Sequence, residues 1–470
     1  MPKKRVKILD FVEVVDIAAK GQAVGKTQDG QVVFMEGAVP GDIIQVQTSR
    51  KRKGAWQGRI IKYHEYSPDR RTAACEHFGV CGGCKWQHLD YNAQLRYKAK
   101  EVHHNLQHIG KLENVSFEPI MAAPKVYDYR NKMEYSFSNQ RWLTQTEIQQ
   151  KDDTLEKNGL GFHKPRMWDK VVDIQKCHLQ AEPSNAIRNF IRSYALKHQL
   201  EFFNPRAQEG FLRTLMIRNT LAGEFMVLLQ FYRDIPEERE SLLRTLQENF
   251  PEIRSLLYCI NSKANDTLYD QEIICFSGQP FITETMEGLG FKINAKSFFQ
   301  TNSAQALALY QRVRDLAQLK ASDRVYDLYT GTGTIALFMA RHCQQVVGIE
   351  SVPEAIEAAR QNAQANGIEN CHFEVGDMKD CFNEAFVQKY GPADVIITDP
   401  PRNGMHGDVV QQLIQAQAEK IVYVSCNSAT QARDLFLLKE FYSVEISQAV
   451  DMFPQTHHVE NIVLLKRKTK

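Results

Sequence analysis

The chain has 470 residues and a formal net charge of +2, with 43% hydrophobic and 24% charged residues, which is ordinary for a soluble globular protein. No apolar run approaches the roughly 18 residues of a membrane span, and the near-neutral charge gives no overall sign of a nucleic-acid binder. At about 150 residues per domain, this length predicts roughly three domains.

The first segment, residues 1–64, is predicted to be a small β-barrel. Short β-rich runs alternate with turns, a rhythm typical of barrels that are often used for RNA. The basic start at residues 1–5 is interrupted by Asp10 and Glu13 and does not resemble a signal peptide, which favours the cytoplasm. The β-rich runs are Val12–Val15, Val32–Phe34, Ile43–Val46 and Gly58–Ile61.

A run of basic residues lies within this segment. Between residues 50 and 62 there are six basic residues and no acidic one, with Trp56 among them. Cations beside an aromatic ring suit phosphate contact and base stacking. A solvated hairpin explains the run alone equally well. The six are Arg50, Lys51, Arg52, Lys53, Arg59 and Lys62.

Four cysteines of the next segment, residues 65–290, are candidate metal ligands. Cys75, Cys81 and Cys84 lie close together in the sequence, and Cys177 follows at a distance. In a reducing compartment such thiolates bind zinc or an iron–sulfur cluster, and their spacing alone does not choose between the two.

The rest of residues 65–290 is predicted to be a mixed α+β domain. Strand-like runs occur at Leu212–Asn219 and Phe225–Phe231, and a helix-prone stretch begins at about Tyr91. Alternatively, the helical stretch 91–124 packs on the next predicted domain, residues 291–470, and not on the rest of its own segment. The pattern of this segment by itself predicts no function.

From residue 291 to residue 470 the pattern predicts a Rossmann-like, doubly wound parallel sheet. Apolar strands alternate with helical stretches such as Pro353–Asn366, as in an α/β fold. Ligands of such folds bind at the carboxyl ends of the strands. The predicted strands are Val325–Leu328, Gln345–Ile349, His372–Val375, Val395–Thr398 and Ile421–Ser425.

A glycine-rich turn after the first of these strands predicts a nucleoside-cofactor site. Gly331 and Gly333 let the backbone pass close to a ligand, and Glu350 after the next strand can accept both ribose hydroxyls. Ala336 stands where the dinucleotide fingerprint has its third glycine, a replacement which that fingerprint permits. Asp399 and the two prolines after it favour S-adenosylmethionine over a nicotinamide cofactor. A plain turn ended by two prolines is the alternative.

Cys426, at the end of the fifth strand, is the candidate nucleophile. A thiolate that adds to carbon 6 of uracil makes carbon 5 reactive toward a sulfonium methyl. Because a free thiol has a pKa of about 8.5, Cys426 needs a pocket that favours its thiolate. A base must then remove the carbon 5 proton, and His457, His458 and Glu460 are all chemically suited. On a strand, His458 and Glu460 would share a face. A buried structural cysteine and a surface carboxylate are the plain alternatives.

At these residues the chain resembles the bacterial RNA uridine-5-methyltransferase family, in particular its iron–sulfur members that act on 23S ribosomal RNA. The resemblance spans nearly the whole chain. It rests on the segments Phe34–Asp42, Cys75–Cys84, Tyr129–Met133, Ser297–Asn302, Asp327–Gly333, Asp399–Arg402, Ser425–Asn427 and His458–Glu460.

The resemblance implies a role for each candidate residue. Cys426 is the implied nucleophile and Glu460 the implied base, and the four cysteines are implied to hold a 4Fe-4S cluster. The barrel resembles a TRAM domain, an RNA-binding module. Thr330, where the family often has Cys, and Thr334, where Asn is known, leave the roles of those two side chains open. Contacts to the cofactor and the target base are implied for Gln300, Tyr329, Gly331, Gly333, Thr334, Glu350, Asp377 and Asp399.

Rival functions fit the sequence less well. A cytosine-5 methyltransferase usually has a second cysteine directly after the first prolines, where this chain has Arg402 and Asn403. An amino-group methyltransferase needs an aromatic residue in place of Arg402, and a non-catalytic RNA-binding protein has no use for Cys426 and Glu460. Radical use of S-adenosylmethionine needs three cysteines, commonly as C-x3-C-x2-C, whereas five residues separate Cys75 from Cys81.

The expected partner is RNA. Ribosomal 23S RNA is favoured over transfer RNA because the familiar bacterial transfer-RNA enzyme of the family lacks both the barrel and the cluster. Some transfer-RNA relatives do have such clusters, so both substrates stay open. No membrane and no obligate protein partner are expected.

Overall fold

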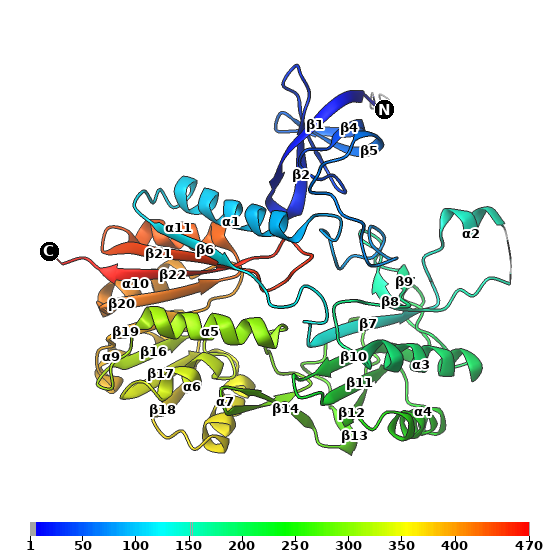
Figure 1. Ribbon diagram of the computed structural model, residues 1–470. Coiled ribbons are helices and arrows are strands. Elements are labelled where there is room, and N and C mark those ends of the chain that lie inside the picture. The colour runs from blue at the N-terminus through cyan, green and yellow to red at the C-terminus, as the bar shows by residue number, and fades with distance from the viewer. Residues whose placement is uncertain (1–5, 151, 153, 470) are drawn as a thin grey trace.

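The computed structural model describes residues 6–150, 152 and 154–469, so the basic start at residues 1–5 lies outside the described residues. Figure 1 shows a small β-barrel at the N-terminal end and, below it, a body in which two sheets lie side by side. In the described part of the chain, no helix has the length and apolar character needed to cross a membrane.

The N-terminal barrel is closed, with the strand order β1-β2-β3-β5-β4. Alternate side chains point inward, so Val12, Val33, Ile44 and Val46 are fully buried in its core. This confirms the predicted N-terminal β-barrel. Its elements are β1 (Ile8–Ala18), η1 (Ala19–Gly21), β2 (Gln22–Lys26), β3 (Val32–Met35), β4 (Ile43–Arg52) and β5 (Ala55–Glu65).

The second sheet, here called the central sheet, has the order β13-β12-β11-β10-β7-β8-β9. Ile187 of α3 and Leu242 of α4 pack with Leu215 of β10 in its buried core. The strands predicted at Leu212–Asn219 and Phe225–Phe231 are confirmed as β10 and β11. The remaining elements are β7 (Lys132–Ser138), α2 (Gln145–Gln150), β8 (Gly159–His163), β9 (Val171–Asp173), α3 (Ser184–Lys197), α4 (Pro236–Asn249), β12 (Ile253–Ile260) and β13 (Ile274–Gly278).

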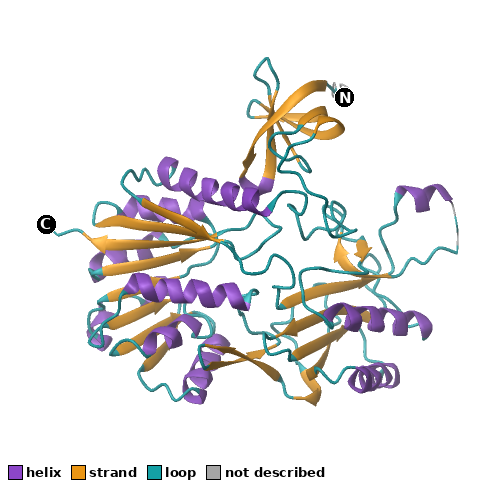
Figure 2. Cartoon of the chain, viewed as in Figure 1, coloured by secondary structure: helices purple, strands orange, loops and turns teal. Residues whose placement is uncertain are grey.

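The third sheet, here called the Rossmann sheet, has the order β18-β17-β16-β19-β20-β22-β21-β6. Strands β16 to β20 run parallel and β22 runs antiparallel between β20 and β21, which confirms the predicted doubly wound α/β fold. Figure 2 shows helices packed around its strands. The strands are β16 (Arg324–Leu328), β17 (Gln345–Glu350), β18 (Cys371–Val375), β19 (Val395–Thr398), β20 (Lys420–Ser425), β21 (Tyr442–Val450) and β22 (Glu460–Arg467). The helices are α5 (Ser303–Ala317), α6 (Thr334–Ala340), α7 (Pro353–Ala365), α8 (Met378–Cys381), α9 (Glu384–Tyr390), α10 (Gly407–Ala416) and α11 (Ser428–Leu438).

The helical stretch predicted over residues 91–124 is wrong in its second half. α1 (Tyr91–His108) is a helix, but Ser116–Met121 forms β6, which pairs in parallel with β21 at the edge of the Rossmann sheet. An edge strand tolerates Pro119 because one side of it makes no ladder hydrogen bonds. Val102 of α1 lies in the same core as Ala432 of α11. This segment therefore packs on the Rossmann sheet.

The predicted boundary between residues 290 and 291 falls within a hairpin. β14 (Phe281–Met286) pairs antiparallel with β15 (Leu289–Asn294), and Ile282 and Phe291 are buried in the core of the Rossmann sheet. The Asn366 Oδ1 at the end of α7 accepts from the Gly290 N–H at 2.8 Å. The hairpin is a separate two-stranded sheet, and its apolar face is buried in a core that contains residues of both the central sheet and the Rossmann sheet.

Candidate active site

The turn after β16 contains three residues with positive φ: Tyr329 (63°), Gly331 (56°) and Gly333 (78°). A Cβ at Gly333 would lie 2.9 Å from the Cβ of Ala359 in α7, so the turn can pack this closely on α7 only with glycine at position 333. A Cβ at Gly331 would have no atom of the described residues within 4 Å. The space over the turn is open, and a ligand can lie against its backbone.

Glu350 joins this turn to the start of α7. Its carboxylate accepts hydrogen bonds from the N–H groups of Ser351 (2.7 Å), Val352 (3.0 Å) and Gly331 (3.2 Å). A fourth hydrogen bond comes from Ser351 Oγ at 3.0 Å, and like those of the Ser351 and Val352 N–H groups it ends on Oε1. Among the described residues Oε2 accepts from Gly331 alone, so acceptor capacity remains on Oε2 for a ligand hydroxyl.

Asp377 and Tyr329 lie beside Glu350. The Gly376 N–H donates to the Glu350 carbonyl at 2.9 Å, which brings the end of β18 next to the end of β17. The exposed Asp377 caps α8 by accepting from the Lys379 N–H at 3.2 Å. Burial raises the pKa of Tyr329 to about 12, and Asp377 is first among the nearby carboxylates that add to this rise. The structure therefore brings these three predicted site residues together.

The structure gives less direct support for Gln300 and Thr334 as ligand contacts than for the glycine turn. The Gln300 carbonyl accepts from Asn131 Nδ2 at 2.9 Å, while its neighbour Thr301 lines the cavity of the cysteine cluster described below. Thr334 is the first residue of α6, and its Oγ1 lies 3.4 Å from the Oγ1 of Thr332. The side chain of Thr334 is buried, so it has less access to a ligand than the glycine turn has.

Asp399 and Asp327 form a pair of carboxyls at the ends of β19 and β16. The Asp399 N–H donates to the Leu328 carbonyl at 3.4 Å, and Asp327 accepts from Thr330 Oγ1 at 2.5 Å. Burial raises the pKa of each carboxyl to about 7, and the charge of Asp327 adds to the rise at Asp399. Asp399 keeps a partly exposed side chain, but the protein packed around it removes enough water to disfavour its charge.

Strand register brings Cys426 and Glu460 together. β20 and β22 are antiparallel, and Ser425 pairs with Asn461 at this end of the two strands. Cys426 is the residue after Ser425 and Glu460 is the residue before Asn461, so both adjoin this last pair. The charge of Glu460 acts on the Cys426 thiol, in keeping with this proximity. The candidate nucleophile and the candidate base therefore share the end of the sheet at which Asp399 also lies.

The groups around Cys426 disfavour its thiolate in the ligand-free protein. Burial raises the pKa of Cys426 to about 11, and Glu460 and Asp399 add to the rise while Arg402 opposes it. Burial, with a further contribution from Asp399, also raises the pKa of Glu460 to about 8. Burial is the largest of these influences, and the need for a pocket that favours the thiolate stays a prediction.

Arg402 is the cation of this group, and its loop is held by the start of α11. The Arg402 carbonyl accepts from Asn427 Nδ2 at 2.9 Å and from Thr430 Oγ1 at 3.2 Å. Asn427 also caps α11, because its Oδ1 accepts from the Ala429 N–H at 3.1 Å. One asparagine next to Cys426 thus fixes the Arg402 loop beside the thiol.

Asp327 and Arg402 belong to this charged group but were not among the predicted site residues. Asp327 has a sequence signal, since it is a carboxylate inside an apolar strand directly before the glycine turn. Arg402 has a weaker signal, since it follows the two prolines at a strand end.

His457 and His458 lie in the turn before β22, which begins at Glu460. The prediction that His458 and Glu460 share a strand face is therefore wrong. Burial, with some help from nearby cations, lowers the pKa of His457 to about 3 and that of His458 to about 4. Both rings are neutral at pH 7.

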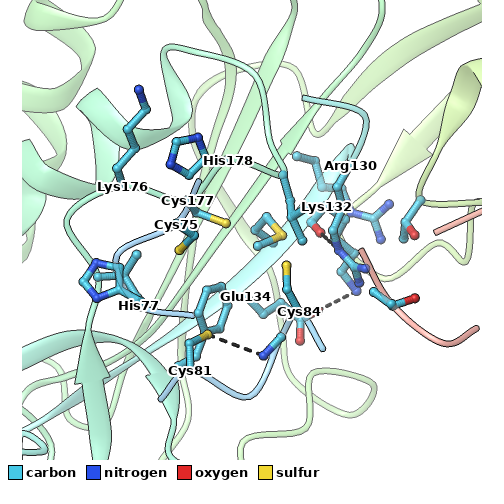
Figure 3. Close-up of a pocket in the computed structure, with 18 of the residues that line it drawn as sticks. Cys75, His77, Cys81, Cys84, Arg130, Lys132, Glu134, Lys176, Cys177 and His178 are labelled. Carbon is cyan, nitrogen blue, oxygen red and sulfur yellow. Dashed lines mark hydrogen bonds and ion pairs between the residues drawn. The ribbon is translucent and has the colours of Figure 1, made fainter. Parts of the chain in front are cut away.

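The four predicted metal-ligand cysteines line one cavity of about 490 Å³. Figure 3 shows the sulfur atoms of Cys75, Cys81, Cys84 and Cys177 around a shared space. The first three come from one loop, and Cys177 comes from the segment that follows β9. The fold thus brings together cysteines that are distant in the sequence.

Burial is the main influence on these thiols. It raises the pKa of Cys81 to about 11 and that of Cys84 to about 12, and the other three thiols of the cluster add to the rise at Cys84. Among the residues that the structure describes, no three His, Cys, Asp or Glu side chains are arranged to hold one metal ion. The four cysteines are therefore gathered in one cavity without converging on a single point.

Two sequence comparisons bear on this site. The pattern of the family described as tRNA (uracil-5-)-methyltransferase matches residues 207–468. An uncharacterized RNA methyltransferase of Porphyromonas gingivalis is 51% identical, and the match covers 98% of this chain and 100% of the relative. Another, of Chlorobaculum tepidum, is 39% identical, with 97% of this chain and 96% of the relative covered.

A solved structure extends the likeness to the fold. The crystal structure of Pyrococcus abyssi tRNA (uracil-54, C5)-methyltransferase in complex with S-adenosyl-L-homocysteine matches with a TM-score of 0.73 and 27% identity. The match covers 97% of this chain and 100% of that one, so it includes the barrel and the central sheet as well as the Rossmann sheet. The chain therefore belongs to the family of RNA (uracil-5-)-methyltransferases, which are transferases of methyl groups.

Proposed function

We propose that the protein methylates carbon 5 of a uridine in 23S ribosomal RNA, with S-adenosylmethionine as methyl donor, Cys426 as covalent nucleophile and Glu460 as base. The observation that carries this proposal is the antiparallel pairing of Ser425 with Asn461, because Cys426 and Glu460 are the adjoining residues at the ligand edge of the Rossmann sheet. Family membership supports the type of reaction.

The proposed reaction begins at Cys426. Cys426 first loses its thiol proton to water, and the thiolate then adds to carbon 6 of uracil, so that the electron pair of the 5,6 double bond forms an enolate whose carbon 5 is nucleophilic. Carbon 5 takes the methyl group of bound S-adenosylmethionine, and the electron pair of the broken sulfur–methyl bond stays on the sulfur of S-adenosyl-L-homocysteine, which leaves. Glu460 then takes the proton from carbon 5, the double bond re-forms, and the sulfur leaves carbon 6 as the thiolate. Only the ionised carboxylate of Glu460 can take this proton, and its raised pKa of about 8 makes that carboxylate a stronger base than an ordinary glutamate.

The residues around the glycine turn fit a nucleoside cofactor. The open space over Gly331 admits a ligand close to the backbone, and Glu350 keeps acceptors for ribose hydroxyls. The Pyrococcus abyssi enzyme was solved with S-adenosyl-L-homocysteine, which supports the same class of cofactor here. The proposed contacts are Gln300, Tyr329, Gly331, Gly333, Thr334, Glu350, Asp377 and Asp399.

A 4Fe-4S cluster is the proposed occupant of the cysteine cavity. Cys75, Cys81, Cys84 and Cys177 fit it because each thiolate of such a cluster binds a different iron atom and need not approach a common point. A single zinc ion needs all four sulfurs at about 2.3 Å from one point, an arrangement that the described residues do not show.

The barrel supports an RNA substrate. The six basic residues at positions 50–62 are exposed on the β4–β5 hairpin, and Lys51 Nζ lies 5.4 Å from the centre of the Trp56 ring. Transfer RNA is the second candidate substrate, because the Pyrococcus abyssi tRNA enzyme matches along its full length. The barrel and the cysteine segment therefore do not by themselves separate the two RNA classes.

The proposal is tested with Cys426→Ala. We expect methyl transfer to RNA to fall by at least about 10³-fold, while S-adenosylmethionine binds as in the wild type. Cys275→Ala is the matched control, because Cys275 is an exposed thiol on β13. Retained methylation in Cys426→Ala would refute the covalent route.

The RNA class is tested separately. Mapping of 5-methyluridine in ribosomal and transfer RNA from a strain that lacks the gene is expected to show the loss in 23S RNA. A loss confined to transfer RNA would replace the first substrate by the second.

A further inference from the structure

We propose that α1 and the Lys85–Trp86 segment form a clamp that positions Glu460, with Gln94 and Lys98 as positioning residues. The inference rests on the proposed role of Glu460 as the base. The clamp holds the segment 451–459, here called the base loop, which joins β21 to β22 and ends next to Glu460.

The backbone of the base loop is held from several sides. Its four consecutive carbonyls from Met452 to Gln455 all accept hydrogen bonds from segments distant in the sequence, so the loop has little freedom to shift. The donors are Asn302 Nδ2 to Met452 (3.0 Å), Lys98 Nζ to Phe453 (3.0 Å), Tyr129 OH to Pro454 (2.9 Å), and the N–H groups of Lys85 (2.9 Å) and Trp86 (3.0 Å) to Gln455.

Gln94 of α1 holds the middle of the base loop. Its Oε1 accepts from the Gln455 N–H at 2.9 Å, and its Nε2 donates to Gln455 Oε1 at 3.0 Å. The same Nε2 donates to the carbonyls of Trp86 (3.1 Å) and Leu89 (2.9 Å). Gln94 is 1% exposed. Through these hydrogen bonds its buried amide connects α1 with both the segment after Cys84 and the base loop.

Lys98 of α1 holds the beginning of the base loop. Its Nζ lies 2.5 Å from Asp451 Oδ1, and both side chains are fully buried. The Asp451 N–H also donates to the Met121 carbonyl of β6 at 2.9 Å. A buried ion pair is weak evidence for stability, since apolar residues of similar volume often serve as well. This pair fixes the first residue of the loop that carries the base.

Glu460 pairs with Val450 as the first residue of β22 and directly follows the base loop, so the strand pair and the loop together set its position. The residue is 6% exposed, and its carboxyl must reach the proton on carbon 5 while Cys426 holds carbon 6. A shift of about 1 Å at a reacting group can cost about 100-fold in rate. Loosening the clamp should therefore slow proton removal, the step after methyl transfer, and leave the binding of RNA and cofactor unchanged.

The test is Gln94→Met in the full-length protein, which keeps the side-chain length and removes the amide. We expect kcat to fall by about 10- to 100-fold, the dissociation constant for RNA to stay unchanged, and the covalent protein–RNA adduct to accumulate. Lys100→Met is the matched control, because Lys100 lies on the same helix and pairs with the exposed Asp16 of β1 rather than with the base loop.

Two further variants keep the inference falsifiable. If Gln94→Met fails to fold, the double variant Lys98→Met with Asp451→Leu replaces the buried pair by apolar residues and is measured in the same way. Glu460→Gln is the reference for adduct formation, and its failure to form adduct would overturn the proposed function itself. Adduct in Glu460→Gln, with none in the folded clamp variants, would overturn the clamp alone.

Discussion

The two candidate sites of this protein are built in different ways. The Cys426 end of the Rossmann sheet is made by strands, and each functional side chain follows the carboxyl end of a strand or faces one across an antiparallel pair. The cysteines of the second site come from loops, since Cys75–Cys84 and the Cys177 segment meet with no strand pairing between them in the described part of the chain, although strands β7, β8 and β10 also line the cavity.

The two sites also differ in their charges. Around Cys426, burial and two carboxyls raise the pKa of the thiol while Arg402 lowers it, and burial raises the pKa of the carboxyls of Asp399 and Glu460 to about 7 and about 8, so these carboxyls titrate near neutral pH. In the cysteine cavity, burial and neighbouring thiols all act in one direction at Cys84 apart from one hydrogen bond. The first arrangement suits proton transfer to and from a substrate. The second suits permanent neutralisation by a bound metal cluster.

The largest effect is expected at the Cys426 end of the Rossmann sheet, the site that is built by strands. Glu460→Gln should lower turnover by at least about 10³-fold and trap a covalent protein–RNA adduct, because the carbon 5 proton stays in place. Denaturing gel electrophoresis with labelled RNA measures the adduct. Glu440→Gln, an exposed glutamate, is the control. Normal turnover without adduct would remove Glu460 from this role.

The second prediction concerns the loop-built site. Cys84→Ser should abolish the bound iron and the brown absorbance that the proposed 4Fe-4S cluster would give. It should also lower Tm by several degrees because metal binding contributes to folding. Cys275→Ser, which changes an exposed cysteine outside the cavity, should do neither. A colourless wild-type protein that contains zinc would contradict the proposed 4Fe-4S cluster, because the cavity would then hold a single ion.

The third prediction uses the pH dependence of stability in the ligand-free protein. The pKa of Glu460 is raised from its ordinary 4.5 to about 8, so between these values the folded state keeps a proton that the unfolded state has lost. Stability at this group therefore falls as pH rises from about 5 to about 8. Glu460→Gln should become more stabilising by about 1–3 kcal/mol over that range. Urea unfolding at both pH values measures it, and a pH-independent difference would contradict the raised pKa.

The smallest expected effect concerns Arg402, the cation beside Cys426. Arg402→Gln should slow alkylation of Cys426 by iodoacetamide at pH 8 by about threefold, because Arg402 lowers the pKa of this thiol. Peptide mass spectrometry measures the modified fraction, with Arg341→Gln beyond α6 as control. Faster alkylation in Arg402→Gln would show that the guanidinium shields the thiol instead of favouring its ionised form.

Much of the fold could be predicted because its signals are local. The parallel strands at Val325–Leu328 and Val395–Thr398 are short apolar runs between turns, and the barrel strands alternate with glycine turns. β6 could not be predicted in this way. Its residues Ser116–Met121 carry no strand pattern, and they pair with β21 far along the chain. The β14–β15 hairpin was not predicted for a similar reason, since its core partners lie in earlier strands of the central sheet and in later helices.

The sequence by itself determined which groups stand at the strand ends: the glycine turn, Glu350, Asp399 and Cys426. It could do so because a strand and the residue that follows it are neighbours in the chain. The tertiary structure decided that Cys426 lies near Glu460, that carboxyls raise the pKa of this thiol, and that α1 holds the base loop. These properties depend on long-range register, burial and charge, which arise only when distant segments pack together.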